Sequence, residues 1–361
     1  MSPSLRFPEF TGEWEKYKIE DITDAVSSGK SKNHFSNGEY NLYGSTGIIG
    51  RTDKALYDGK LVLVARVGAN AGFLQIINEP CGITDNTLIL KPKGIDAFYL
   101  YYFLQHFNLN RLIFGSGQPL ITGGMLKKVK VSLGTISEQS KIVKFLSLLD
   151  ERIAVQSRLI EDLKKLRCAI VEKMFKQSKA NGRLGDFIEQ VSVRNKNGLY
   201  SNVLSVSNKQ GFVKQSEQFE DRTVASEDTS NYKIVKRNNF AYNPARINVG
   251  SIARLTKFDV GIVSPMYVCF RTKASIIPEY MEAFFTSQQF FYEMMKRLEG
   301  SVRLCLSYEG LCNIPVYITD MNKQIAMGQN ISLILSKIGL EIEYLGRLHQ
   351  QKQYLLRKMF I

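Results

Sequence analysis

The feature that most constrains this chain is an internal duplication at a fixed offset of 185 residues. The triplet Lys-Met-Phe at 173–175 recurs at 358–360, and at the same offset Gln139 falls on Gln324. One register holds without a gap over about 60 residues. A single duplication of this length predicts a pair of related halves, each with its own core, and not a solenoid of many short repeats.

The correspondence continues upstream at slightly smaller offsets. The segment "PEYMEAFF" at 278–285 resembles "AFYLYYFL" at 97–104, and Asn70-x-Gly72 matches Asn248-x-Gly250. Loop insertions would change the offset in this way. The first 55 or so residues of each half do not align, so we expect two halves on one plan that begin differently.

The downstream part of each half has apolar residues at alternating steps of four and three, which is typical of a coiled-coil helix. Each such helix is expected to be about 33 residues, or roughly 50 Å, long. Polar residues interrupt both seams at matching places, Gln156 with Glu341 and Arg167 with Lys352. We therefore expect an antiparallel coiled coil between the two helices. The alternative is that each packs as an ordinary amphipathic helix on its own domain. The seam positions are Leu146, Leu149, Ile153, Ile160, Leu163, Ile170, Ile331, Ile334, Ile338, Leu345, Leu348 and Leu355.

The upstream parts mix strand and helix patterns. Short β-branched runs such as "LVLVA" (61–65) and "MYVCF" (266–270) are typical of strands, and helices are expected at 96–110 and 278–298. The predicted fold class is therefore α/β (α+β), with two globular domains, two long helices and a pseudo-twofold duplication. The expected boundaries are 1–137 for the first domain, 138–180 for the central helix and linker, 181–319 for the second domain and 320–361 for the C-terminal helix.

The charge of the chain favours an acidic partner. The net charge is +14, and Lys plus Arg exceed Asp plus Glu by 3, 4, 4 and 3 in those four segments in turn. Because the excess is spread along the chain, an extended polyanion such as duplex DNA is the natural partner. The alternative is a mildly basic protein without such a partner. Five scattered cysteines, with no Cys-x-x-Cys, favour a reducing cytoplasm, and we expect no membrane span and no secretory signal.

With these residues, the layout resembles the specificity subunit of type I restriction–modification enzymes. The opening "LRFPEFTGEWEKYKIEDI" looks like the usual start of that family. "YGSTGIIGR", "VGANAGF" and "ITDNTLIL" are similar to one common target-recognition domain, and "YKIVKRNNFAYNPARINVGSIA" with "GIVSPMYVCF" is similar to another. "SEQSKIVKFLSLLDERI" resembles the start of the family's central helix, and Lys-Met-Phe closes the helical segments in many members.

The resemblance implies a non-catalytic subunit in which each target-recognition domain reads one half of a split DNA target. It also implies that the helices set the gap and dock two modification subunits. Those subunits would bind S-adenosylmethionine, so no cofactor is expected in this chain, and restriction subunits with motor and nuclease activity would join them. Three alternatives remain: a free-standing, repressor-like DNA-binding protein, a single-chain methyltransferase, and a coiled-coil scaffold without a DNA role.

Motifs for catalysis by this chain are incomplete. "SSGKS" at 27–31 ends like a phosphate-binding loop, but Asp24 occupies the position of its first glycine. "NPAR" at 243–246 begins like a methyltransferase motif, but Arg246 stands where an aromatic residue should stack on the base. The three histidines lie far apart without acidic or cysteine neighbours. No catalytic residue and no metal ligand is predicted.

The candidate DNA contacts are polar residues in loops. Arg and Lys suit guanine, Asn and Gln suit adenine, and phosphates accept bonds from Lys, Arg, Ser and Thr. In the first half the candidates are Lys30, Lys32, Asn33, Ser45, Thr46, Arg51, Lys54, Arg66, Asn70 and Gln118. In the second half they are Arg194, Lys196, Asn208, Lys209, Arg222, Arg246, Asn248, Ser301 and Arg303.

Overall fold

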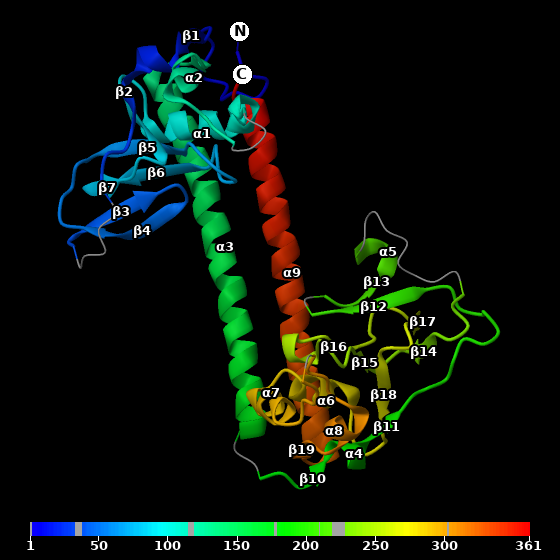
Figure 1. Cartoon of the computed structure of the whole chain (residues 1–361). Coiled ribbons are helices and arrows are strands. Elements are labelled where there is room, and N and C mark those ends of the chain that lie inside the picture. Colours follow the sequence, from blue (N-terminus) through cyan, green and yellow to red (C-terminus); the bar gives the residue numbers. More distant parts are fainter. Residues whose placement is uncertain are drawn as a thin grey trace. The chain divides into compact units, whose positions relative to one another are not determined.

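The computed structural model describes residues 2–32, 38–114, 119–176, 179–208, 210–218, 228–301 and 303–361 (Figure 1). The chain divides into two compact units. Unit 1 contains residues 1–157 and 343–361, and unit 2 contains residues 158–342. Two long helices, α3 (Ile136–Lys176) and α9 (Met321–Met359), each contribute residues to both units.

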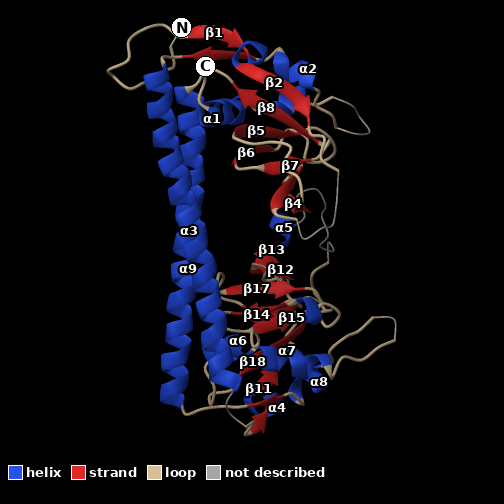
Figure 2. Cartoon of the chain, turned by 90° about the vertical axis from the view of Figure 1, so that its left-hand side faces the viewer, coloured by secondary structure: helices blue, strands red, loops and turns tan. Residues whose placement is uncertain are grey.

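Unit 1 contains two sheets and a small ribbon. The larger sheet has the order β2-β8-β5-β6 with antiparallel neighbours, and the smaller has the order β4-β3-β7, in which β3 and β7 are parallel. Helix α1 packs on β5, β6 and β8 (Figure 2). The ribbon pairs β1 with β9. The strands are β1 (Glu15–Lys18), β2 (Thr23–Ser28), β3 (Tyr40–Gly44), β4 (Gly47–Thr52), β5 (Lys60–Ala65), β6 (Leu74–Asn78), β7 (Cys81–Ile83), β8 (Thr87–Pro92) and β9 (Lys130–Leu133), and the helices are α1 (Ala97–Phe107) and α2 (Gly123–Lys127), with 3₁₀ turns η1 (Ile19–Ile22) and η2 (Leu109–Leu112).

Unit 2 repeats this plan. Its sheet β11-β18-β15-β16 has the same order and directions as the larger sheet of unit 1, and its sheet β13-β12-β17-β14 contains the same parallel pair plus one strand. The strands are β10 (Gly182–Arg183), β11 (Ile188–Gln190), β12 (Val203–Ser207), β13 (Gly211–Lys214), β14 (Lys233–Lys236), β15 (Phe240–Tyr242), β16 (Ile252–Arg254), β17 (Val260–Val263), β18 (Val268–Thr272) and β19 (Pro315–Val316). The helices are α4 (Leu184–Phe187), α5 (Gln215–Gln218), α6 (Pro278–Phe284), α7 (Gln288–Met295) and α8 (Tyr308–Cys312), with η3 (Ile247–Val249).

The duplication begins earlier in the chain than sequence comparison indicates. In unit 1 the backbone N–H of Lys18 donates to Asp21 Oδ2 at 2.8 Å, and in unit 2 that of Arg183 donates to Asp186 Oδ2 at 2.8 Å. Just after these turns, the N–H of Lys93 donates to Ile22 O, as that of Lys273 donates to Phe187 O, both at 2.8 Å. These matching hydrogen bonds show that the two halves already share a fold in a region where sequence comparison aligns nothing.

The two long uninterrupted helices are confirmed, and parts of them pair in each unit (Figure 2). In unit 1, Asp150 of α3 bonds Lys352 of α9 at 2.6 Å and Arg152 lies over the ring of Tyr344, so the two helices run antiparallel there. In unit 2, Val171 of α3 and Ile331 of α9 belong to one buried core. The seam residues Leu146, Leu149, Ile160, Ile331, Ile338, Leu348 and Leu355 are buried, and Ile153, Leu163, Ile170, Ile334 and Leu345 are partly buried.

The repeated Lys-Met-Phe triplet has the same role at both of its positions. Phe175 packs against Tyr280 and Phe284 of α6, with ring centroids 5.2 and 5.1 Å apart. Phe360 packs against Tyr99 and Phe103 of α1, at 5.2 and 6.4 Å. Tyr99 and Tyr280, like Phe103 and Phe284, correspond at the offset of 181. Each triplet therefore anchors the end of one long helix to a globular core, α3 in unit 2 and α9 in unit 1.

The matching basic interruptions also face the globular cores. The Lys352 ammonium lies 5.3 Å from the ring centre of Tyr102 on α1, besides its bond to Asp150. Burial raises the pKa of the Glu282 carboxyl on α6, while Arg254 and, more weakly, Arg167 lower it, so Arg167 lies near this carboxyl. These positions thus help to attach the long helices to the domains.

The segment 278–298 differs from its prediction as a single helix. It forms α6 and α7, separated near Ser287, whose hydroxyl accepts from the backbone N–H of Phe290 at 3.1 Å. A side-chain cap of this kind begins a new helix. The apolar pattern runs across the break and therefore hides it.

Candidate nucleic-acid interface

A hollow of about 500 Å³ in unit 1 brings together four of the predicted contacts. Lys30 and Lys32 come from the segment after β2, and Ser45 and Thr46 from the β3–β4 turn. Three segments that are far apart in sequence form this hollow, and its lining is Lys30, Ser31, Lys32, Gly44, Ser45, Thr46, Ile49, Thr84, Asp85 and Asn86. It offers ammonium, hydroxyl and amide groups, which suit both phosphates and base edges.

The hollow is held in shape by buried strands and by bonds from its rim. Ser31 Oγ accepts from the backbone N–H of Ile83 at 3.0 Å, and Gln75 Nε2 donates to the carbonyls of Gly44 and Ser45 at 3.0 Å each. Lys30, Lys32 and Thr46 remain exposed. Fixed backbone with exposed polar tips is the arrangement that a specific contact surface requires.

Arg66 lies next to the same hollow. Its backbone N–H donates to Asn86 O at 3.0 Å, and its Nη1 donates to Ser28 Oγ at 3.0 Å. Its Nε is buried and has no hydrogen-bond acceptor among the described residues. Within the described parts of the chain, only some of the donors of the Arg66 guanidinium therefore have an acceptor. A further acceptor would complete its hydrogen bonding.

The turn after β5 carries Asn70 and recurs in unit 2 with Asn248. Gly72 and Gly250 both have φ of +88°, a conformation that favours glycine. The same backbone hydrogen bond closes both turns. The N–H of Ala65 donates to Phe73 O at 2.9 Å, and that of Asn243 donates to Ser251 O at 3.1 Å. The match of Asn-x-Gly in the sequence therefore reflects one conserved turn geometry.

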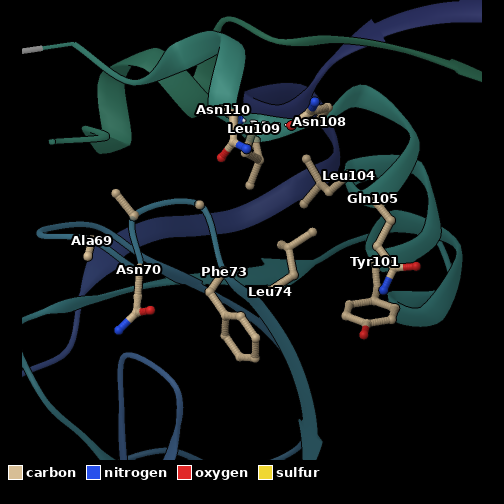
Figure 3. A pocket seen from close by; sticks show the side chains of 12 residues that line it. Ala69, Asn70, Phe73, Leu74, Tyr101, Leu104, Gln105, Asn108, Leu109 and Asn110 are labelled. Atoms are coloured by element: carbon tan, nitrogen blue, oxygen red, sulfur yellow. Dashed lines mark hydrogen bonds between the residues drawn. The ribbon is translucent and has the colours of Figure 1, made fainter. Parts of the chain in front are cut away.

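Figure 3 shows the surroundings of this turn in unit 1, where a hollow of about 510 Å³ separates it from α1. Asn70 and Phe73 lie on the turn side, and Tyr101 and Gln105 on the side of α1. Asn70 is exposed, and 48% of the Phe73 surface is exposed. The side-chain amides can hydrogen-bond the edge of a base. The exposed aromatic ring next to them can stack on the face of the base.

In unit 2, Arg246 precedes the equivalent turn, and Asn208 lies beside it. The Cβ of Asn208 is 3.7 Å from where a side chain on Gly250 would begin. The loop at 299–305 is closed by two bonds between the backbones of Glu299 and Cys305, and Leu306 N–H joins it to Pro244 O at 3.1 Å. Ser301 and Arg303 in that loop are exposed. The structure therefore brings Arg246, Asn248 and Asn208 to one region and ties the loop of Ser301 and Arg303 to it.

The remaining predicted contacts do not line the two hollows of unit 1 or fall outside the described residues. Arg51 donates from Nε and Nη2 to the carbonyls of Gly38 and Glu39, both at 2.8 Å, and so braces its own hairpin. Arg194 bonds Asn231 Oδ1 at 2.9 Å, while Lys54 and Lys196 are exposed. The positions that lie outside the described residues are Asn33, Gln118, Lys209 and Arg222.

Sequence reasoning missed Asn86 and Phe73 as site residues. Asn86 stands in "ITDNTLIL", which resembles part of a target-recognition domain but contributes no residue to the predicted contacts, and the structure places Thr84–Asn86 on the wall of the first hollow. A Thr-Asp-Asn sequence before an apolar run is typical of a turn and could have signalled it. No local pattern distinguishes Phe73 from a core residue.

The described parts of the chain contain neither a metal-ligand group nor a membrane-spanning helix. Among these residues, no three or more His, Cys, Asp or Glu side chains are grouped so that they could hold a metal ion. Over the same residues, none of the helices is long and apolar enough to cross a membrane.

Comparison with known proteins shows what parts of this chain are similar to. Residues 11–165 match the family model of the type I restriction modification DNA specificity domain. A type I specificity subunit of Mycoplasma genitalium is 28% identical over 189 residues, which is 50% of this chain and 49% of that protein. The specificity subunit of the type I restriction enzyme EcoprrI from Escherichia coli is 28% identical over 112 residues, 31% of this chain and 28% of that protein. The alignments thus span about half or less of these relatives.

Along nearly the whole chain, the fold is similar to that of solved structures. The crystal structure of the type I restriction–modification S subunit from M. genitalium superimposes with a TM-score of 0.66 at 20% identity, and covers 100% of this chain and 99% of that one. A chain from a structure on the assembly and conformational transition of a type I system gives 0.55 at 11% identity, covering 97% and 98%. Residues 11–165 are thus similar to the DNA specificity domain of type I restriction–modification systems, and the chain shares the fold of the M. genitalium S subunit.

Proposed function

We propose that the chain is the sequence-specific DNA-recognition subunit of a type I restriction–modification complex. Each globular domain reads one half of a bipartite target in double-stranded DNA. The family model over residues 11–165 carries the proposal, because it is a model of a DNA specificity domain. The two relatives are named as type I specificity subunits, one of them as part of a type I restriction enzyme, which favours a subunit over a free-standing repressor.

The duplicated framework supports two readers with different targets. The turns at Asn70 and Asn248 share their backbone geometry, but Arg246 precedes the second turn where Gly68 stands in the first. Because base edges are distinguished by side-chain donors and acceptors, two such surfaces on one scaffold would select different half-sites. We assign the readers to residues 1–137 and 181–319, and the helical segments to 138–180 and 320–361.

The long helices would set the gap between the half-sites. A straight helix of the length of α3, Ile136–Lys176, extends about 60 Å at 1.5 Å per residue. A helix is stiff over this distance, so its length can act as a ruler for the spacer. The salt dependence of binding should be steep, because the phosphate contacts of both readers release counterions.

Exposed apolar pairs on these helices are candidate docking points for two modification subunits. Leu148 and Val155 of α3 are each 57% exposed. Leu333 and Leu340 of α9 correspond to them at the offset of 185 and are 68% and 63% exposed. Beside Leu333, a hollow of about 600 Å³ lies between α9 and the start of α6. Two equivalent apolar patches in one chain suit two copies of one partner.

Catalysis would belong to those partners. The modification subunits would bind S-adenosylmethionine and methylate the target, restriction subunits would add the motor and nuclease activities, and the complex would act in the cytoplasm. The chain itself would be non-catalytic: its contribution is to bind DNA and to hold the partners at a defined distance.

Co-expression with its modification subunits and mapping of the methylated sites tests the proposal. The expected result is methylation at one bipartite motif with a fixed gap, dependent on this chain. A matched variant with Leu148→Asp and Leu333→Asp should retain DNA binding in a shift assay but lose co-purification of the partners. Unchanged methylation in the absence of the chain would refute the proposal.

A further inference from the structure

The start of α9 in unit 2 is closed by a buried glutamine with complete hydrogen bonding. Gln324 is 1% exposed. Its Nε2 donates to Thr319 O at 2.9 Å and to Ser275 O at 3.2 Å, and its Oε1 accepts from the backbone N–H of Ile277 at 3.1 Å. These bonds attach the first turn of the helix to the segment that leads into α6.

The corresponding residue in unit 1, Gln139, is bonded on one side only. It is 3% exposed, and its Nε2 donates to Gly134 O at 3.0 Å, which matches the bond of Gln324 to Thr319. Its buried Oε1 receives no hydrogen bond from the described residues. A buried carbonyl oxygen without a donor costs stability, and native proteins rarely retain one without a use.

Unit 1 has a hollow of about 490 Å³ where Gln139 lies. The start of α3 forms one wall, and the turn at Lys93–Gly94, which leads into α1, forms another. The residue that corresponds to Ile277 is Asp96, which caps α1 by accepting from Phe98 N–H at 2.7 Å. The bond that Gln324 accepts from Ile277 in unit 2 thus has no counterpart at Gln139 among the described residues, and we call the hollow beside Gln139 the Gln139 pocket.

The lining of the Gln139 pocket is rich in acceptors. Glu13, Glu15 and Asp21 contribute carboxylates, against the single cation Lys93 in the lining. Lys93 forms an ion pair with Asp24 instead, with its Nζ 3.9 Å from Asp24 Oδ1. Glu15 accepts from the Tyr17 hydroxyl, and Asp21 from Lys18 N–H, so both carboxylates are held in place. The electrostatic balance of this pocket opposes the net charge of the chain, which is +14.

We propose that the Gln139 pocket binds a guanidinium or ammonium group carried by a Lys- or Arg-bearing segment of a protein partner. Such groups are pure donors and carry positive charge, so they satisfy the Gln139 carbonyl and the carboxylates together. The volume exceeds that of a lone side chain and accommodates neighbouring backbone. In the second half, the oxygen of Gln324 is already bonded by Ile277. The Gln139 pocket therefore gives the duplicated chain a binding site in its first half. The inference does not depend on DNA recognition.

Calorimetric titration of the full chain with an acetylated hexa-arginine peptide tests the proposal, with a hexa-citrulline peptide as the neutral isostere. We expect saturable binding of the arginine peptide that weakens with added salt. Gln139→Met removes the carbonyl at similar volume and should lower the affinity about tenfold or more, because it removes a bond to a charged group. The matched variant Gln324→Met, on the closed half, should leave the affinity unchanged.

A second variant keeps the test decisive if Gln139→Met disturbs folding, which its circular dichroism and thermal midpoint would show. Glu15→Gln alters an exposed carboxylate in the lining and should also weaken the arginine peptide. Spermidine is titrated in parallel, and tighter binding of this free polyamine would overturn the assignment to a protein segment. Equal affinity for the citrulline peptide, no binding at all, or wild-type affinity in both pocket variants would overturn the proposal.

Discussion

Replacing Phe360 with Ala tests how the end of α9 is attached to unit 1. Phe360 is 3% exposed and contacts the rings of Tyr99 and Phe103, and the imidazole of His106 at 6.0 Å. Truncating a buried Phe costs about 3–5 kcal/mol, through lost transfer free energy and the cavity that remains. The opening free energy of α1 should fall by a similar amount, so its amides should exchange about a hundredfold faster or more.

Hydrogen–deuterium exchange with peptide resolution measures this effect in the full chain. Phe360→Ala should accelerate exchange in α1 and leave α6 unchanged, while Phe175→Ala should do the reverse, because Phe175 contacts Tyr280 and Phe284. Phe291→Ala is the control: this residue is 51% exposed and should change exchange little. The reasoning is wrong if Phe360→Ala accelerates α6, or if both variants affect both helices equally.

Three further predictions concern specificity, spacing and pH. Arg246→Ala should relax base selection at one half-site, and Arg66→Ala at the other, in sites selected from a random pool; equal loss at both halves by either variant argues against separate readers. Four residues inserted near Leu159 should lengthen the accepted gap by about 6 Å of helix, which methylation mapping would show, and an unaltered gap would refute the ruler. His106 has a lowered pKa because burial and nearby Arg111 disfavour its charged form. The unfolded chain therefore binds the proton more readily, so stability should decline as pH falls through about 6.5. His106→Gln should reduce that decline in the thermal midpoint between neutral and mildly acidic pH, and a decline of wild-type size would contradict the assignment.

Patterns that depend on local geometry were read correctly from the sequence. The steps of four and three between Leu146, Leu149 and Ile153 follow from the helical period and predict a long helix wherever the chain runs in space. The β-branched run at 61–65 predicts a strand, and β5 covers it. In contrast, the break between α6 and α7 depends on the cap at Ser287, which the continuous apolar pattern conceals.

The candidate interface was predicted as a set of loops and not as a surface. Lys30 and Ser45 were singled out because loop cations and hydroxyls suit DNA. Lys30 and Ser45 line one hollow with Asn86 because β3 pairs with β7. This pairing joins residues about 40 positions apart in the chain. Side-chain type limits what a residue can bind, but strand pairing decides which residues share a hollow.

The sequence alone determined that this protein is a duplicated α/β chain with two long helices, because repetition and periodicity are written in the order of the residues. Only the tertiary structure decided that the triplet ending each long helix packs against the aromatic pair on α1 or α6, and that the side-chain oxygen of Gln324 accepts a hydrogen bond that Gln139 lacks. The physical reason is that such contacts join residues more than 40 positions apart, so they follow from the path of the chain and from packing, which no local pattern encodes.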